Sequence, residues 1–263
     1  MHTYGFRTAG FRNGPLQIAL ETIADSGYDC LELCLEYHGL ADMTVESMRE
    51  LAQDIQRRGL RVSSFSYHGD GQTPDERWAG IRRSLELASA CEVPVLILNG
   101  ERLGNTPPHQ ALRTFIDRLG DLVPLAQSAN VSLAVEPEPG LSVQNTADML
   151  TVLEQLPAPP VAVNLDIGHA FLTDDLGHTF RSLGPHIVHL HVEDMRMGIH
   201  KHLLPGEGDI NFSLIYELVQ EVGRPLPWVV DLFNVDADPI DYCRRALSKL
   251  KQLLPAGTSR QPG

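Results

Sequence analysis

Hydrophobic positions follow two patterns that alternate along the chain. Short apolar or β-branched runs are followed by longer stretches in which apolar residues recur every three or four positions. The longer stretches predict amphipathic helices, most clearly over Val45–Ile55, Leu112–Ala126 and Ile240–Leu254. The short runs predict strands over Thr3–Arg7, Cys30–Leu35, Val62–Tyr67, Val95–Asn99, Val131–Glu136, Val161–Asp166, Ile187–Val192 and Trp228–Phe233.

This alternation favours parallel strands joined by right-handed helical crossovers. Eight such units in about 250 residues suit a closed barrel. The main rival is an open doubly wound sheet, but the segment TAGFRNG after the first strand lacks the GxGxxG pattern typical of that fold. We therefore predict an α/β chain with a single (β/α)8 TIM barrel over residues 1–254 and a disordered tail over 255–263.

Composition and charge narrow the classes of partner. The 263 residues include 34 acidic and 21 basic side chains, and the net charge of −13 argues against nucleic acid and anionic membranes as partners. No apolar run approaches the roughly 20 residues of a membrane helix, and the N-terminus lacks a signal-peptide core, so we expect a cytoplasmic protein. The four cysteines lie in apolar segments, as buried free thiols do. Whether the chain forms homo-oligomers is left open.

Polar residues close most of the predicted strands. In a TIM barrel these carboxyl ends of strands carry the functional side chains. A carboxylate that ends an apolar run is costly to bury without a cation or hydrogen-bond donors, so several of them around one ring suggest a metal. Mixed Asp, Glu and His ligands suit zinc, manganese, iron or cobalt. The residues at or just after these ends are His68, Asn99, Glu136, Asp166, His191 and Asp231.

Histidines gather in the last third of the chain. The segment DIGH places Asp166 and His169 three residues apart directly after a strand. The stretch HIVHLHVEDMRMGIHKHLLPGEGDINF then holds five of the eleven histidines. Because strand residues alternate between faces, His189 and His191 share one face, and we expect His189, one layer deeper, to be a core histidine.

Four motifs in this order resemble one family. They are EPEPG, DIGHA, HLHVED followed by HLLPGEGDINF, and VVDLF. Together they resemble the sugar phosphate isomerase/epimerase family of xylose isomerase-like TIM barrels, which also contains apurinic endonuclease IV. The resemblance covers nearly the whole predicted barrel.

The resemblance implies a set of site residues. One divalent transition metal (Mn, Zn or Co) would be held at the motif positions Glu136, Asp166, His191 and Asp231. His169 matches the family's substrate-binding histidine, and His202, before the GEG turn, would also face the site. We expect His68 and Glu138 to contact substrate as well. A second metal could bind through His169, His200 and His202.

The chemistry implied is isomerisation or epimerisation of a small sugar, keto-sugar or polyol. The metal would stabilise an enediolate, while Glu136 removes a proton and Asp231 or Glu138 returns it. Family epimerases carry Glu rather than Asp at position 231, which puts the role of Asp231 as a base in doubt. Arg102 and Arg196 are the arginines evident near strand ends, so phosphorylation of the substrate is left open.

Three alternatives stay open. A dehydratase or β-eliminating sugar enzyme would use the same enediolate on the same scaffold. A multi-zinc phosphoesterase-type hydrolase would need two or three ions, although the net charge of −13 disfavours a DNA substrate. A catalytically inactive barrel that only binds a ligand would hold no transition metal.

Overall fold

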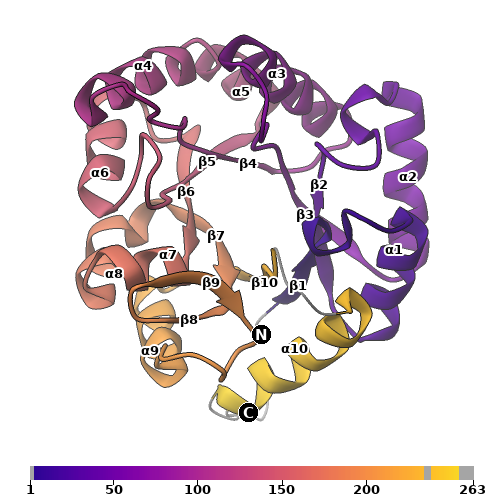
Figure 1. Ribbon diagram of the computed structural model, residues 1–263. Coiled ribbons are helices and arrows are strands. Elements are labelled where there is room, and N and C mark those ends of the chain that lie inside the picture. Colours follow the sequence, from indigo (N-terminus) through magenta and orange to yellow (C-terminus); the bar gives the residue numbers. More distant parts are fainter. Residues whose placement is uncertain (1–2, 234–237, 255–263) are drawn as a thin grey trace, which may run out of the picture.

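The computed structural model describes residues 3–233 and 238–254. Eight parallel strands close into a barrel in the order β1-β10-β7-β6-β5-β4-β3-β2, and Figure 1 looks along its axis. The prediction of a (β/α)8 barrel is therefore confirmed, whereas the predicted disordered tail, 255–263, lies outside the described residues. The strands are β1 (Thr3–Arg7), β2 (Cys30–Cys34), β3 (Arg61–Ser66), β4 (Val95–Asn99), β5 (Ser132–Glu136), β6 (Val161–Asp166), β7 (Ile187–Val192) and β10 (Pro227–Val230).

The helices surround the barrel, and α10 packs against α1 where the ring closes (Figure 1). Buried apolar side chains such as Phe65, Phe115 and Trp228 belong to one core cluster. None of the helices in the described ranges is long and apolar enough to cross a membrane. The helices are α1 (Leu16–Asp25), α2 (Val45–Arg57), α3 (Pro74–Ala90), α4 (Pro108–Gly120), α5 (Val123–Ala129), α6 (Thr146–Gln155), α7 (Ile167–Thr173), α8 (Leu176–Leu183), α9 (Phe212–Val222) and α10 (Pro239–Leu253).

Local sequence signals set several helix boundaries. Thr73 begins α3 with a capping box, in which its side chain accepts from the backbone N–H of Glu76 and the Glu76 carboxylate accepts in return from Thr73. The stretch predicted as one helix over Leu112–Ala126 is instead two helices, α4 and α5. Pro124 lies in the first turn of α5, where its missing N–H is tolerated, and inside one long helix it would have broken the hydrogen-bond ladder.

A short antiparallel hairpin interrupts the barrel pattern after β7. It consists of β8 (Asp194–Arg196) and β9 (Ile199–Leu203), and the sequence did not reveal it. The buried carboxylate of Asp194 accepts from the backbone N–H groups of Gly206 and Ile210, at 2.9 and 3.1 Å. This side chain thereby ties the GEG turn to the base of the hairpin.

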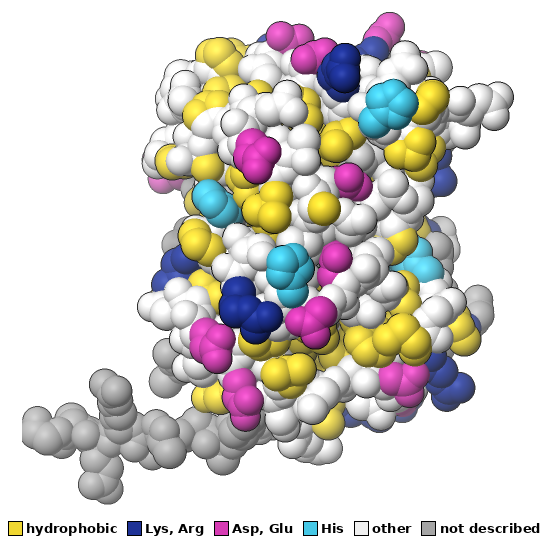
Figure 2. Space-filling model, turned by 90° about the vertical axis from the view of Figure 1, so that its left-hand side faces the viewer, with side chains coloured by type: hydrophobic (Ala, Val, Ile, Leu, Met, Phe, Trp, Pro, Cys, Tyr) yellow, Lys and Arg dark blue, Asp and Glu magenta, His cyan; other side chains and the backbone are white. Residues whose placement is uncertain are grey.

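The flank in Figure 2 shows acidic and basic side chains interspersed with apolar ones. On the described part of this face, the basic side chains are scattered rather than gathered in one large patch.

The cysteine thiols give a first testable prediction. Burial raises the pKa of Cys30 to about 11 and of Cys243 to about 12, and it raises the pKa of Cys34 well above its usual value. Only Cys91 is partly exposed among the four. At pH 8 a thiol-specific chromogenic disulfide should therefore label at most one thiol per native chain and all four after denaturation. Rapid labelling of two or more thiols in the native protein would contradict this packing.

Candidate metal and substrate site

The carboxyl ends of the barrel strands surround a cavity of about 830 Å³. The strand register brings predicted site residues side by side, since Asn99 pairs with Glu136 and Asp166 pairs with His191. All four side chains predicted to bind substrate line this cavity: His68, Glu138, His169 and His202.

The four predicted metal ligands are buried and lie close together. Glu136, Asp166 and His191 each offer a ligand atom within 4.8 Å of the others. Asp166 belongs to a second such group with His202 and Asp231, and an Asp231 oxygen lies 3.8 Å from His191 Nδ1. None of the four predicted ligands is more than 2% exposed. The structure thus brings the four into two adjacent groups that share Asp166.

A buried carboxylate fixes how the His191 ring is turned. His191 Nε2 lies 2.7 Å from Glu32 Oε2, so Nδ1 faces Glu136 Oε2 at 3.4 Å. Burial lowers the pKa of His191, but Glu32 and Glu136 outweigh it and raise the pKa well above its usual value. A carboxylate that accepts from the remote ring nitrogen is a common way to orient a metal-binding histidine. Nδ1 is therefore the nitrogen directed at the site.

Glu136 stands at the centre of the cluster. Its Oε2 accepts from the Asn164 amide at 3.1 Å and lies 3.5 Å from His68 Nε2. Burial alone would raise the pKa of Glu136, yet the neighbouring His191 and His68 hold it well below the usual value. Glu136 is consequently an anion at neutral pH, which suits both metal binding and proton abstraction.

Asp166 has a structural as well as a chemical task. Its Oδ1 caps α7 by accepting from the backbone N–H of His169 at 2.7 Å. Gly168, in the same turn, donates its N–H to the buried Glu193 at 2.8 Å, and a Cβ at this position would collide with that carboxyl group. Burial and the neighbouring Asp166 raise the pKa of Glu193 well above its usual value. The DIGH turn is thus held in a single arrangement.

Unpartnered buried atoms indicate that the cluster fits a cation. Asp166 Oδ2, Asp231 Oδ1 and His169 Nδ1 are buried without a hydrogen-bond partner among the described residues. Leaving such atoms unpaired costs about 1–3 kcal/mol each, a cost that a cation coordinated by them would remove. Two carboxylate oxygens and imidazole nitrogens are a donor set suited to a divalent transition metal.

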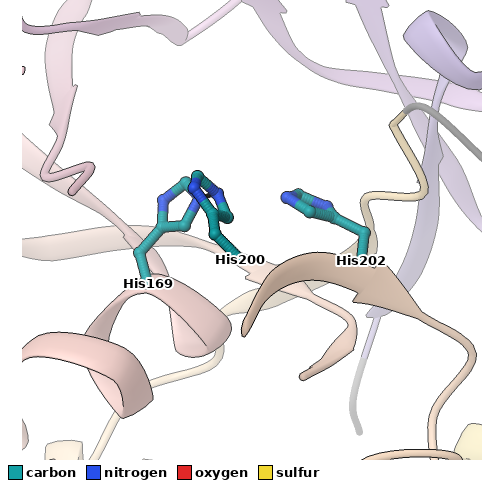
Figure 3. A group of neighbouring side chains, drawn as sticks. All are labelled: His169, His200 and His202. Carbon is teal, nitrogen blue, oxygen red and sulfur yellow. Dashed lines mark hydrogen bonds between the residues drawn. The ribbon is translucent and has the colours of Figure 1, made fainter. Parts of the chain in front are cut away.

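A second cluster consists of His169, His200 and His202. Figure 3 shows His169 on α7 facing His200 and His202, which come from β9. The Nε2 atoms of His169 and His200 lie 3.0 Å apart, and one ligand atom from each of the three rings lies within 4.8 Å of the others. His202 Nδ1 lies 2.8 Å from the Asp231 carbonyl oxygen, so it carries the proton and leaves Nε2 as a ligand atom.

Two charged residues of the site were missed by sequence reasoning. The Arg7 guanidinium, 5% exposed, pairs with Glu32 at 2.8 Å and with Asp231 at 2.9 Å. Burial would raise the pKa of Asp231, but Arg7 and His202 keep it below its usual value. Signals for both residues were present: Arg7 closes the first predicted strand, and Glu32 is a lone carboxylate within the apolar run CLELC.

His189 is a core histidine, as expected. It is 0% exposed, and its ring nitrogens lie 2.9 Å from Asn164 Oδ1 and 3.1 Å from Ser64 Oγ. Burial lowers its pKa to about 3, so the ring is neutral. Both nitrogens have hydrogen-bond partners in the protein, although His189 also forms a group with Glu32 and His191 in which one ligand atom from each lies within 4.8 Å of the others.

Comparison with known proteins agrees with this architecture. The chain is 25% identical over 227 residues to L-ribulose-5-phosphate 3-epimerase UlaE of Escherichia coli O157:H7, covering 81% of this chain and 80% of that protein. It is also 25% identical over 177 residues to an uncharacterized protein of Methanocaldococcus jannaschii, covering 66% of this chain and 67% of the relative.

Solved structures share the fold at lower identity. The IolI protein with a bound zinc atom superimposes with a TM-score of 0.80 at 16% identity, covering 95% of this chain and 97% of that one. A D-tagatose 3-epimerase-like protein has a TM-score of 0.79 at 18% identity, with the same coverage of 95% and 97%. The sequence model of the family described as "Xylose isomerase-like TIM barrel" matches residues 20–253. The chain therefore belongs to the xylose isomerase-like TIM barrel family.

Proposed function

We propose that the protein is a divalent metal-dependent isomerase or epimerase of a small sugar, keto-sugar or polyol. The observation that carries this proposal is the convergence of Glu136, Asp166, His191 and Asp231 at the barrel mouth, with buried carboxylate oxygens that lack partners. The epimerase activity in the name of UlaE, and in the descriptions of several solved structures with this fold, supports the same reaction class.

The proposed ion is manganese, zinc or cobalt, held by these four side chains. When bound, it would supply Lewis-acid polarisation of the substrate carbonyl, which makes the adjacent C–H bond more acidic. Zinc in the related IolI structure supports a metal of this class. The protein itself would hold the substrate so that this C–H bond faces a base.

Glu136 is the proposed base that removes the proton from the α carbon. For epimerisation, the proposed acid on the other side is Asp231 or Glu138. Asp231 pairs with Arg7 through Oδ2, so its unpartnered Oδ1 would first take up a proton from water and then return it to the substrate, while Glu136 releases its proton to water. His68, Glu138, His169 and His202 line the cavity and offer hydrogen bonds to substrate hydroxyls. Together these groups orient the sugar and move one proton off and back.

The three-histidine cluster favours a second candidate, a phosphoesterase-type hydrolase with more than one zinc ion. His169, His200 and His202 offer three nitrogens at a second position beside the first site. Two adjacent ions would suit stabilisation of both the attacking and the leaving oxygen of a phosphoester.

One experiment separates the two candidates. Purified protein would be loaded with manganese, zinc or cobalt, its ions counted by elemental analysis, and keto-sugars incubated with it in D2O. We expect about one ion per chain and metal-dependent uptake of deuterium at the carbon beside the carbonyl. Two or three ions, with phosphodiester cleavage and no deuterium uptake, would establish the hydrolase instead.

A further inference from the structure

The charges that line the cavity bear on the kind of sugar it accepts. Among the described residues, six carboxylates and four Lys or Arg side chains line the cavity. A phosphorylated sugar brings a dianion at neutral pH, and proteins bind such groups with cations whose donors are free to form forked hydrogen bonds. The question is therefore which of these cations could serve a phosphate.

The Arg7 guanidinium is already paired with other side chains of the protein. Its Nε and Nη1 pair with Glu32 and Asp231, and its Nη2 lies against His68 Nδ1. Every nitrogen of this guanidinium thus has a protein partner, and two of the partners are carboxylates. Arg7 balances the negative charge of the site and has no donor left for a substrate phosphate.

Arg77 and Arg102 also bind protein groups, with one donor of Arg77 left over. Arg77 donates to the backbone carbonyls of His68 and Asn99 through Nε and Nη2, while its buried Nη1 has no hydrogen-bond partner among the described residues and offers a single donor rather than a fork. Arg102, at the rim, pairs with Asp70 at 2.9 Å. Lys201 is the other cation that the described residues contribute to the lining, and it lies in the exposed first part of β9.

The rest of the lining suits hydroxyl groups and C–H faces. Glu138 and the imidazoles of His68, His169 and His202 can donate to or accept from sugar hydroxyls. Tyr37 and Phe233 add aromatic surface to the same cavity. Aromatic side chains beside hydrogen-bonding groups suit the C–H faces and the hydroxyls of a sugar.

We infer that this site takes an uncharged keto-sugar or polyol derivative and discriminates against its phosphate ester. The inference rests on the proposed function and specifies its substrate class. Four of the six lining carboxylates, Glu36, Asp70, Glu101 and Glu138, are not among the proposed metal ligands and would not be neutralised by the ion, so a terminal phosphate would meet like charges there. We therefore expect kcat/KM for a free sugar to exceed that for its phosphate by roughly tenfold or more.

The test compares matched pairs of compounds with the metal-loaded enzyme. D-tagatose and D-tagatose 6-phosphate, and L-ribulose and L-ribulose 5-phosphate, would be followed by deuterium uptake in D2O. Faster uptake by the free sugar of an accepted pair supports the inference. Faster uptake by the phosphate overturns the inference but leaves the proposed function intact. If none of the four compounds takes up deuterium while phosphodiesters are cleaved, the proposed function fails and the inference falls with it.

A variant with an altered charge at the cavity rim tests whether electrostatic repulsion causes the proposed preference for the free sugar. Asp70→Asn removes the carboxylate that pairs with Arg102 and so leaves a cation at the rim. We expect it to narrow the preference for the free sugar about threefold or more, mainly through KM for the phosphate. Glu86→Gln is the matched control, because it breaks the exposed Arg83–Glu86 pair on α3 instead. An equal preference in all three proteins would contradict the electrostatic basis of the selectivity.

Discussion

Replacing Glu136 with glutamine should lower kcat for deuterium uptake by about 10²–10⁴-fold, the range expected for loss of a general base. The amide has nearly the same shape but cannot accept the proton of the α carbon. It also offers a poorer oxygen to a divalent ion. The measurement is the initial rate of deuterium incorporation by NMR, with the metal content of each preparation determined in parallel.

Glu86→Gln serves as the control, since it makes the same chemical change on the exposed surface of α3. It should leave kcat within about twofold of the unaltered protein, because surface substitutions of this kind have small effects. The Glu136→Gln protein should remain folded, as judged by its circular dichroism spectrum. If folded Glu136→Gln enzyme keeps more than about a tenth of the activity, Glu136 is not the base.

Replacing Arg7 with methionine should destabilise the fold by about 3–5 kcal/mol, the range for breaking a buried ion pair from one side. Arg7 and its partners Glu32 and Asp231 are all nearly inaccessible to solvent, so the two carboxylates would stay buried without their cation. The measurement is the free energy of unfolding in urea, with a chelator present so that a bound metal does not mask the loss.

The pKa of Glu32 gives the pH dependence of this effect. Burial would raise that pKa, but His191 and Arg7 lower it far below its usual value. A depressed pKa contributes stability that is present above the unfolded value of about 4.3 and is lost as the pH falls below it. The difference between Arg7→Met and the unaltered protein should therefore shrink as the pH drops below about 4.

Arg58→Met is the matched control for Arg7. Arg58 pairs with Asp54 at 2.8 Å on α2, but both side chains are partly exposed. Its loss should cost no more than about 1 kcal/mol, the usual range for surface ion pairs. A similar small cost for Arg7→Met would show that the buried Arg7 pairs do not hold the strand ends together.

The barrel could be predicted because its pattern is local. Most of the eight parallel strands are apolar or β-branched runs in the sequence, and most of their carboxyl ends fall where the run meets a polar residue. Closure of the barrel then places Glu136, Asp166, His191 and Asp231 at one rim without any knowledge of register. The predicted ligands follow from this rule and from motif order.

The arrangement around Arg7 could not be predicted in the same way. Its partners Glu32 and Asp231 lie 25 and 224 residues away, so they meet only through the pairing of β1 with β2 and β10. The hairpin β8–β9 was also missed, because β8 has only three residues, fewer than the four to eight of a run that indicates a strand. Tertiary contacts rather than local propensity determine both features.

Anomalous diffraction from a crystal soaked with manganese or zinc tests the central claim most directly. The account predicts a strong peak at the barrel mouth within about 2.0–2.3 Å of donor atoms from Glu136, Asp166, His191 and Asp231. A peak bound only by other side chains, or no peak at these four residues in a crystal that holds the ion elsewhere, would contradict it.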